Sequence, residues 1–141
     1  MRYLDGTIQE QGLQWFPSPL TILAEMTVAP LMRKTPLAGL LPKFDPNKSC
    51  YARKLYGGFV LARKDVLDKA GWFDDRYFMY AEDVDLSRTV LDLGWKLYYT
   101  ADAEIIHVAG GTSAKAPSGF AILMKSESIN KLIRKYQGGV A

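Results

Sequence analysis

The sequence has one cysteine and one histidine in 141 residues, and this scarcity excludes several kinds of site. The single Cys50 cannot form a disulfide within the chain, and a cysteine–histidine zinc site would have too few ligands. We therefore expect an idle thiol in reducing surroundings. The stretch around His107 offers no Asp-x-Asp and no second histidine, so the local sequence does not complete a metal shell.

Long apolar runs and strong charge are also lacking. The longest apolar stretch, residues 20–32, contains Glu25 and Pro30 and is too short to span a bilayer. Residues 1–6 have no apolar core of a signal peptide, so we expect none. Lys and Arg number 18 against 15 Asp and Glu, a net charge of +3. This mildly basic balance suits a phosphorylated ligand or an anionic membrane surface, and we expect no nucleic-acid partner.

What is present indicates a folded α/β protein. Hydrophobic residues make up 48% of the chain and charged residues 23%, an ordinary globular balance. Strand-like and helix-like stretches alternate, which favours the α/β class. We expect an irregular loop over residues 32–54, strands over 56–63, 95–100 and 103–108, and helices over 19–29, 64–69, 82–93 and 118–137.

Three carboxylates open the predicted helix 82–93: Glu82, Asp83 and Asp85. Helical spacing places Asp83 on the inner side of the helix mouth and Asp85 on the solvated side. Arg88 is a natural ion-pair partner for Glu82 or Asp85 across one turn. Such a cluster is typical of a helix cap, and a cation site or a general base are the functional alternatives.

Other candidate residues each have a structural and a functional interpretation. His107 is either a hydrogen-bonded structural residue or a ligand for phosphate or metal. Gly57 and Gly58 mark either tight packing or close approach of a ligand to the backbone. Trp72 and its aromatic neighbours are either core residues or platforms for sugar rings. The basic residues of the last helix form either a solvated face or a contact with anionic lipid.

Taken together, these motifs resemble the second half of a bacterial glycosyltransferase family 2 enzyme of the rhamnosyltransferase-like kind. Their order along the chain carries the resemblance, and residues 5–9 and 16–18 are similar to the middle segment of that family. The matching motifs are Gly57–Lys64 (GGFVLARK), Gly71–Asp74 (GWFD), Phe78–Leu86 (FMYAEDVDL), Gly94–Leu97 (GWKL), and His107 followed by Gly110–Ser113 (GGTS).

The resemblance implies a partial GT-A fold, a mixed sheet with flanking helices, and an inverting nucleotide-diphospho-sugar transferase that uses Mg²⁺ or Mn²⁺. It makes Asp83 the general base that deprotonates the acceptor hydroxyl, with Glu82 beside it. It places His107 at the diphosphate or its metal. The remaining residues that it assigns to substrate binding are Gly57, Gly58, Trp72, Asp85 and Arg88.

The same resemblance implies a nucleotide-sugar donor and a glycan or lipid-linked acceptor at the cytoplasmic face of the membrane. The family's N-terminal nucleotide-binding half, with its Asp-x-Asp metal motif, has no counterpart here. We therefore expect one domain, residues 1–141, that forms the acceptor and base half and is inactive alone. The missing half or a homodimer would complete it, and residues 20–29 and the helix 118–141 would touch the membrane. The alternative is a non-catalytic module that binds glycan or a partner subunit.

Overall fold

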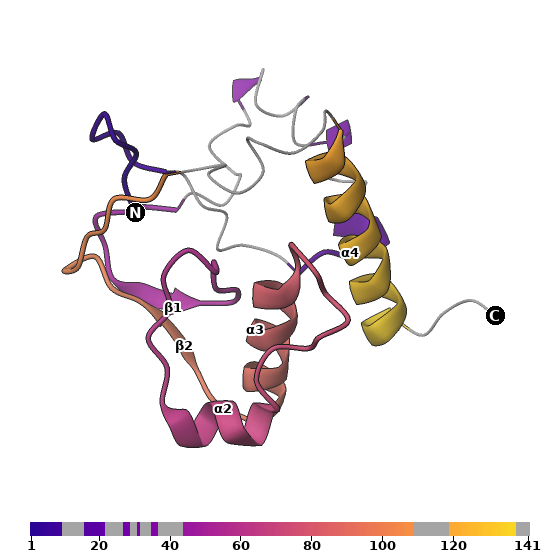
Figure 1. Cartoon of the computed structure of the whole chain (residues 1–141). Helices are drawn as coiled ribbons and strands as arrows, with labels where there is room; N and C mark the ends of the chain where they lie inside the picture. Colours follow the sequence, from indigo (N-terminus) through magenta and orange to yellow (C-terminus); the bar gives the residue numbers. More distant parts are fainter. Residues whose placement is uncertain are drawn as a thin grey trace.

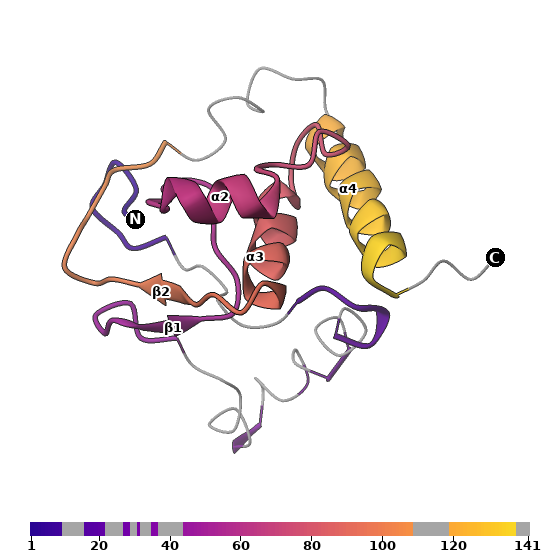
Figure 2. The same cartoon turned by 90° about the horizontal axis from the view of Figure 1, so that it is seen from below.

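The computed structural model describes residues 1–9, 16–21, 27–28, 31, 35–36, 44–108 and 119–137. In both views helix α3 lies between the strands on one side and helix α4 on the other, with α2 against one end of α3 (Figures 1 and 2). The named elements are β1 (Cys50–Ala52), α2 (Lys64–Ala70), α3 (Glu82–Asp92), β2 (Leu97–Tyr99) and α4 (Phe120–Gln137).

The helices begin and end where the sequence predicts, within about two residues. Helix α2 stops at Gly71, whose φ of 79° is a left-handed conformation that glycine adopts without strain. Gly94, with φ 83°, follows α3 in the same way, and Gly119, with φ 85°, precedes α4. The predictions of helices over 64–69, 82–93 and 118–137 are confirmed.

The sheet that the described residues form is smaller than the sequence predicts. Strands β1 and β2 pair antiparallel, with Ala52 opposite Leu97. Strand β2 lies within the predicted 95–100, whereas β1 falls in the stretch predicted to be an irregular loop. The predicted strand 103–108 contributes only an isolated bridge between Ile106 and Arg2. The coarse α/β assignment holds, and the described sheet is antiparallel rather than mixed.

The predicted buried strand 56–63 is wrong for this structure. The segment is irregular, and two of its apolar side chains are exposed, Phe59 at 62% and Leu61 at 93%. An apolar run indicates a segment that gains free energy by burial, but a strand also needs a neighbour to accept its backbone hydrogen bonds. No named strand among the described residues pairs with it.

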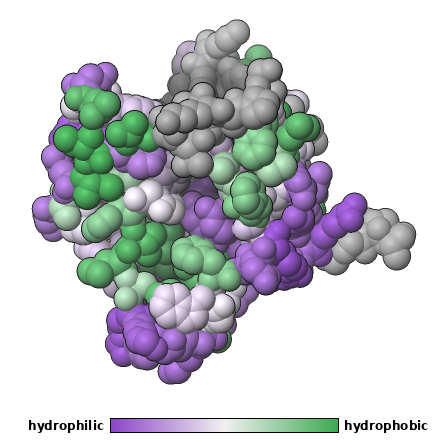
Figure 3. All heavy atoms as spheres, in the orientation of Figure 1, coloured by the Kyte–Doolittle hydropathy of each residue, from purple (hydrophilic) through white to green (hydrophobic). Residues whose placement is uncertain are grey.

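Helix α3 contributes to two apolar clusters on different faces. Leu86 and Val90 pack with Val66 of α2 and with Ala52 and Leu97 of the two strands. On the other face, the described side chains Tyr77, Ala81 and Leu132 pack together and join α3 to α4. Helix α3 is therefore held from both sides. In Figure 3, apolar side chains gather over the part that holds the strands, and polar ones cover α2 and the lower end of α4.

Several predictions fall largely outside the described residues. Of the helix predicted over 19–29, the start is described: Ser18 Oγ accepts the backbone N–H of Thr21 at 3.1 Å, as a helix N-cap does. Most of that helix, the glycine-rich 110–113 and the glycines 138–139 lie outside. Among the helices that the structure describes, none is long and apolar enough to cross a membrane.

Candidate active site

Strained backbone marks the approach to α3. Among the described residues, three other than glycine have left-handed φ angles: Trp72 (62°), Tyr80 (67°) and Ala81 (65°). Tyr80 and Ala81 directly precede Glu82, the first residue of α3. Such conformations cost on the order of 1–3 kcal/mol each and cluster at functional sites, where the surrounding structure holds them. The strained backbone therefore marks the start of α3 as a candidate functional site.

Asp83 faces the glycine-containing segment that the sequence singled out. Its Oδ2 accepts the backbone N–H of Gly57 at 2.9 Å, and its Oδ1 accepts the N–H of Val84 at 2.8 Å. A Cβ added to Gly57 would lie 3.4 Å from Asp83 Cβ, which is ordinary van der Waals contact, so the segment packs directly against α3. The structure thus brings Gly57 and Asp83 together.

Ser87 makes a second connection between α3 and the same segment. Its hydroxyl is fully buried, donates to the carbonyl of Asp83 at 2.5 Å and accepts the backbone N–H of Leu55 at 2.7 Å. The segment 55–57 is therefore tied to α3 by two hydrogen bonds, one turn apart on the helix. Sequence analysis missed Ser87, because a serine inside a helix carries no distinctive signal.

Glu82 has a different environment from Asp83. It is half-buried, and its Oε2 atom is buried with no hydrogen-bond partner among the residues that the structure describes. Burial raises the pKa of Glu82 above its ordinary value, and the negative charge of Asp83 raises it further. Removal from water disfavours the charged form of a carboxyl group. Glu82 consequently holds its proton more readily than an exposed glutamate does.

Asp85 corrects the prediction that it lies on the solvated side of α3. It is 3% exposed, because helix α4 covers that face. Its carboxylate accepts hydrogen bonds from Lys135 Nζ and Tyr136 Oη, both at 2.8 Å, and from Tyr77 Oη at 3.4 Å. Burial, followed by the charge of Asp85, raises the pKa of Tyr77 to about 12. Asp85 is therefore a structural anchor in this chain.

The spacing of Asp83 and Asp85 is itself Asp-x-Asp, which corrects the expectation that the chain lacks such a motif. The two carboxylates have different partners, however. Asp83 binds the backbone of Gly57, whereas Asp85 binds Lys135 of α4. Two carboxylates committed to separate partners do not form one metal site. No group of three potential metal ligands occurs within the described ranges. These residues alone therefore do not fit the expected Mg²⁺ or Mn²⁺.

Arg88 and Trp72 lie away from the Asp83–Gly57 contact. The predicted pairing of Arg88 with Glu82 or Asp85 is wrong: its guanidinium donates to Asp92 at 2.9 Å, one turn further along α3. An arginine reaches a carboxylate four residues ahead, as this one does. Trp72 is 49% exposed, and its indole N–H donates to Asp68 at 3.1 Å. Their assignment to substrate binding stays a prediction.

His107 is held by Gln9, which sequence analysis did not identify. Ring atom Nδ1 of His107 lies 2.9 Å from Gln9 Oε1, and Gln9 Nε2 donates to the carbonyl of His107 at 2.6 Å. The ring of Tyr56 meets the imidazole edge-on, with centroids 6.2 Å apart. The pKa of Tyr56 is raised, first by burial and then by the charge of Asp83. Tyr56 therefore contacts His107 and lies within electrostatic reach of Asp83.

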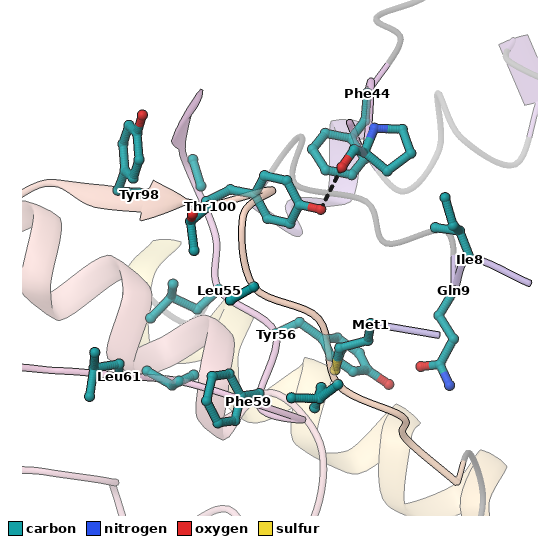
Figure 4. A pocket seen from close by; sticks show the side chains of 16 residues that line it. Met1, Ile8, Gln9, Phe44, Leu55, Tyr56, Phe59, Leu61, Tyr98 and Thr100 are labelled. Carbon is teal, nitrogen blue, oxygen red and sulfur yellow. Dashed lines mark hydrogen bonds between the residues drawn. The ribbon is translucent and has the colours of Figure 1, made fainter. Parts of the chain in front are cut away.

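A cavity of about 300 Å³ opens beside Tyr56 (Figure 4). The N-terminal segment, residues 55–61 and the chain around β2 enclose it. Gly58 is at its edge, where an added Cβ would lie 2.8 Å from the Met1 sulfur. Asp83 is connected to this cavity through Gly57 and Tyr56. The residues that line the cavity are mainly apolar: Met1, Ile8, Gln9, Phe44, Pro46, Ala52, Leu55, Tyr56, Phe59, Val60, Leu61, Tyr98, Tyr99, Thr100, Ala103 and Ile105.

Comparison with known proteins gives one partial similarity. Over 64 residues the chain is 38% identical to N-acetylglucosaminyl-diphospho-decaprenol L-rhamnosyltransferase of Mycobacterium tuberculosis, in strain CDC 1551 / Oshkosh and equally in strain ATCC 25618 / H37Rv. The match covers 45% of this chain and 21% of each relative. No family model matches the chain. No solved structure matches it either. Part of the chain is therefore similar to a glycosyltransferase of the rhamnosyltransferase kind.

Proposed function

We propose that this chain is the acceptor and base half of an inverting glycosyltransferase of family 2. The reaction transfers a sugar from a nucleotide-diphospho-sugar to a hydroxyl of a cell-surface glycan or a lipid-linked acceptor. The similarity to the mycobacterial rhamnosyltransferase supports this class. The name of that relative specifies an L-rhamnosyl group and an N-acetylglucosaminyl-diphospho-decaprenol acceptor, which we take as the model substrates.

The single observation that carries the proposal is the carboxylate of Asp83, fixed between α3 and Gly57. Each of its oxygens accepts one backbone N–H, and a carboxylate oxygen has room for a further hydrogen bond. An acceptor hydroxyl that donates to Asp83 loses its proton to that carboxylate as the hydroxyl oxygen attacks the anomeric carbon. The bond from that carbon to the diphosphate breaks, the nucleoside diphosphate departs, and the configuration inverts.

The neighbouring residues have supporting roles in this proposal. Glu82, whose pKa is raised by burial, places a carboxyl group that binds a proton more readily than an exposed glutamate next to the base. Trp72 offers an exposed ring face for a sugar. The GT-A fold and the nucleotide-binding half are part of the proposal, as is a divalent cation held mainly by ligands other than the described residues. When bound, that cation would neutralise charge on the leaving diphosphate.

Replacement of the base tests the proposal. In protein supplied with the donor-binding half, in cis or in trans, we expect Asp83→Asn to lower the rate of sugar transfer by roughly a hundredfold or more, because an amide accepts no proton. Glu127→Gln is the control, since Glu127 is an exposed carboxylate of another helix, α4. Normal turnover by Asp83→Asn would remove Asp83 from the role of base.

The second candidate function is a non-catalytic module that binds glycan or a partner subunit. The exposed apolar side chains of Phe59 and Leu61 favour it, since exposed apolar patches mark interaction sites. Such a patch fits a homodimer contact or the absent half of the enzyme. Glycan binding by the isolated chain without any nucleotide would support the module. Sedimentation with anionic liposomes at low salt would test peripheral membrane contact, and no binding would remove it.

A further inference from the structure

Gln9 uses both ends of its side-chain amide on the same residue, His107. Its nitrogen donates to the His107 carbonyl at 2.6 Å, and its oxygen faces His107 Nδ1 at 2.9 Å. Gln9 is 5% exposed, so this clamp is shielded from water. The backbone extends it: the N–H of Gln9 donates to Met1, and the N–H of His107 donates to Arg2. Residues 1–9 and His107 thus form one hydrogen-bonded unit.

The orientation of the amide determines where the imidazole proton lies. A carbonyl oxygen only accepts hydrogen bonds, so the group of Gln9 that faces the His107 carbonyl must be the NH₂. The amide oxygen is then the group that faces Nδ1, and Nδ1 must carry a hydrogen to bond to it. In the neutral ring the other nitrogen, Nε2, is left with a free electron pair.

We infer that Gln9 is a positioning residue that fixes His107 with its proton on Nδ1, so that Nε2 serves the candidate site as an electron-pair donor. In this state Nε2 accepts a hydrogen bond from a sugar hydroxyl. It does not donate to a phosphate oxygen, which is itself an acceptor. The ligand part of this inference rests on the proposed function, whereas the position of the proton does not.

The edge contact with Tyr56 connects the Gln9–His107 pair to the cavity. Tyr56 lines the cavity and meets the His107 ring, and its pKa responds to the charge of Asp83. Figure 4 shows the side chains of Gln9, Tyr56 and Met1 close to one another at one end of the cavity. A ligand held by Nε2 would therefore lie close to Tyr56, which lines the cavity.

The chain contains one histidine, so a nitrogen-15 NMR spectrum of histidine-labelled protein reports on His107 alone. At about pH 8, where an ordinary imidazole is neutral, we expect the shift of a protonated nitrogen at Nδ1 and of an unprotonated one at Nε2. An isolated histidine prefers the opposite arrangement. A wild-type spectrum with the proton on Nε2 would overturn the inference without any variant.

Variants then identify Gln9 as the cause. We expect Gln9→Ala to shift the proton toward Nε2, because the acceptor that faces Nδ1 is removed. Thr7→Ala is the matched control, because it removes a hydroxyl bond to Asp5 in the same N-terminal turn and leaves the clamp intact. An unchanged proton position in a folded Gln9→Ala protein would contradict the role of Gln9.

Two probes distinguish the ligands of Nε2, and no sugar transfer is required. A shift of the Nε2 signal on addition of methyl rhamnoside identifies a hydroxyl ligand, and addition of pyrophosphate is the comparison. Pyrophosphate that binds with a proton on Nε2, or no response to either probe, would overturn the ligand assignment. If neither addition changes the spectrum but the proton is on Nδ1, the ligand assignment is wrong. The positioning of His107 by Gln9 would still stand.

Discussion

The ammonium group of Lys135 lies 2.8 Å from the carboxylate of Asp85, and this contact joins the last helix to the helix that carries Glu82 and Asp83. Lys135 also donates to Asp74 at 2.9 Å, so one cation neutralises two carboxylates. The neighbouring negative charges raise the pKa of Lys135 despite its partial burial. The position of α3 thus depends on a residue of α4.

Removal of this cation should destabilise the fold. We expect Lys135→Met to lower the free energy of unfolding by about 3 kcal/mol, because it leaves the buried Asp85 carboxylate without its counter-charge. The control is Asp92→Asn, which breaks the exposed pair with Arg88 and should cost less than about 1 kcal/mol. Urea denaturation measures both, and equal losses for the two variants would mean that the Lys135 pair is no stronger than a surface pair.

Ser87 should control the order of the segment beside Asp83. Ser87→Ala removes the acceptor for the Leu55 N–H, and an unsatisfied buried group costs on the order of 1–3 kcal/mol. We expect faster hydrogen exchange at the Leu55 amide and lower stability, measured by NMR and urea denaturation. Ser126→Ala, at an exposed position of α4, should change neither. Unaltered exchange at Leu55 would show that Ser87 does not hold this segment.

Glu82 should give the stability a distinctive dependence on pH. Because its pKa is raised on folding, the folded chain binds more protons than the unfolded chain between the ordinary value of 4.5 and the raised value. The free energy of unfolding therefore falls as pH rises through that window. We expect Glu82→Gln to be more stable than the wild type at neutral pH, with this advantage shrinking as pH falls through the window and absent below 4.5.

Denaturation curves at several pH values measure this effect. Glu127→Gln is the control, because Glu127 is exposed on α4 and pairs with Lys131. A difference between wild type and Glu82→Gln that stays constant across the window would mean that Glu82 titrates as it does in the unfolded chain.

The exposed segment 59–61 should tolerate charge in the isolated chain. Leu61 is 93% exposed, so Leu61→Lys should change the free energy of unfolding by less than about 0.5 kcal/mol. Leu86, at 3% exposed, is the matched comparison, and Leu86→Ala should cost about 2–5 kcal/mol. A large loss from Leu61→Lys would show that this segment is buried in solution, as its sequence pattern predicts.

The sequence predicted what depends on local signals. Helices α2 and α3 were identified from apolar spacing and from Gly71 and Gly94, whose left-handed conformations follow the helix ends. The structure forms no strand over the predicted range 56–63. A run of apolar residues does not say whether a neighbouring strand is present to pair with it. Strand β1 was missed, because three residues are too few to show a period.

The errors at the candidate site come from contacts between distant parts of the chain. Helical spacing assigned Asp85 to the solvated face, and only the position of α4 shows that this face is covered. Gln9 was overlooked because 98 residues separate it from His107. The contact of Asp83 with Gly57 unites two motifs that the sequence singled out, although nothing in the sequence stated that they would touch.

Asp85 and Lys135 are 50 positions apart, which has a consequence for how this protein is made. A ribosome adds on the order of 5–20 residues each second, so the acidic helix leaves the exit tunnel seconds before the cation that neutralises it. Until then only water can solvate the charge of the Asp85 carboxylate. The Asp85 carboxylate can reach its final arrangement only after Lys135 has left the exit tunnel.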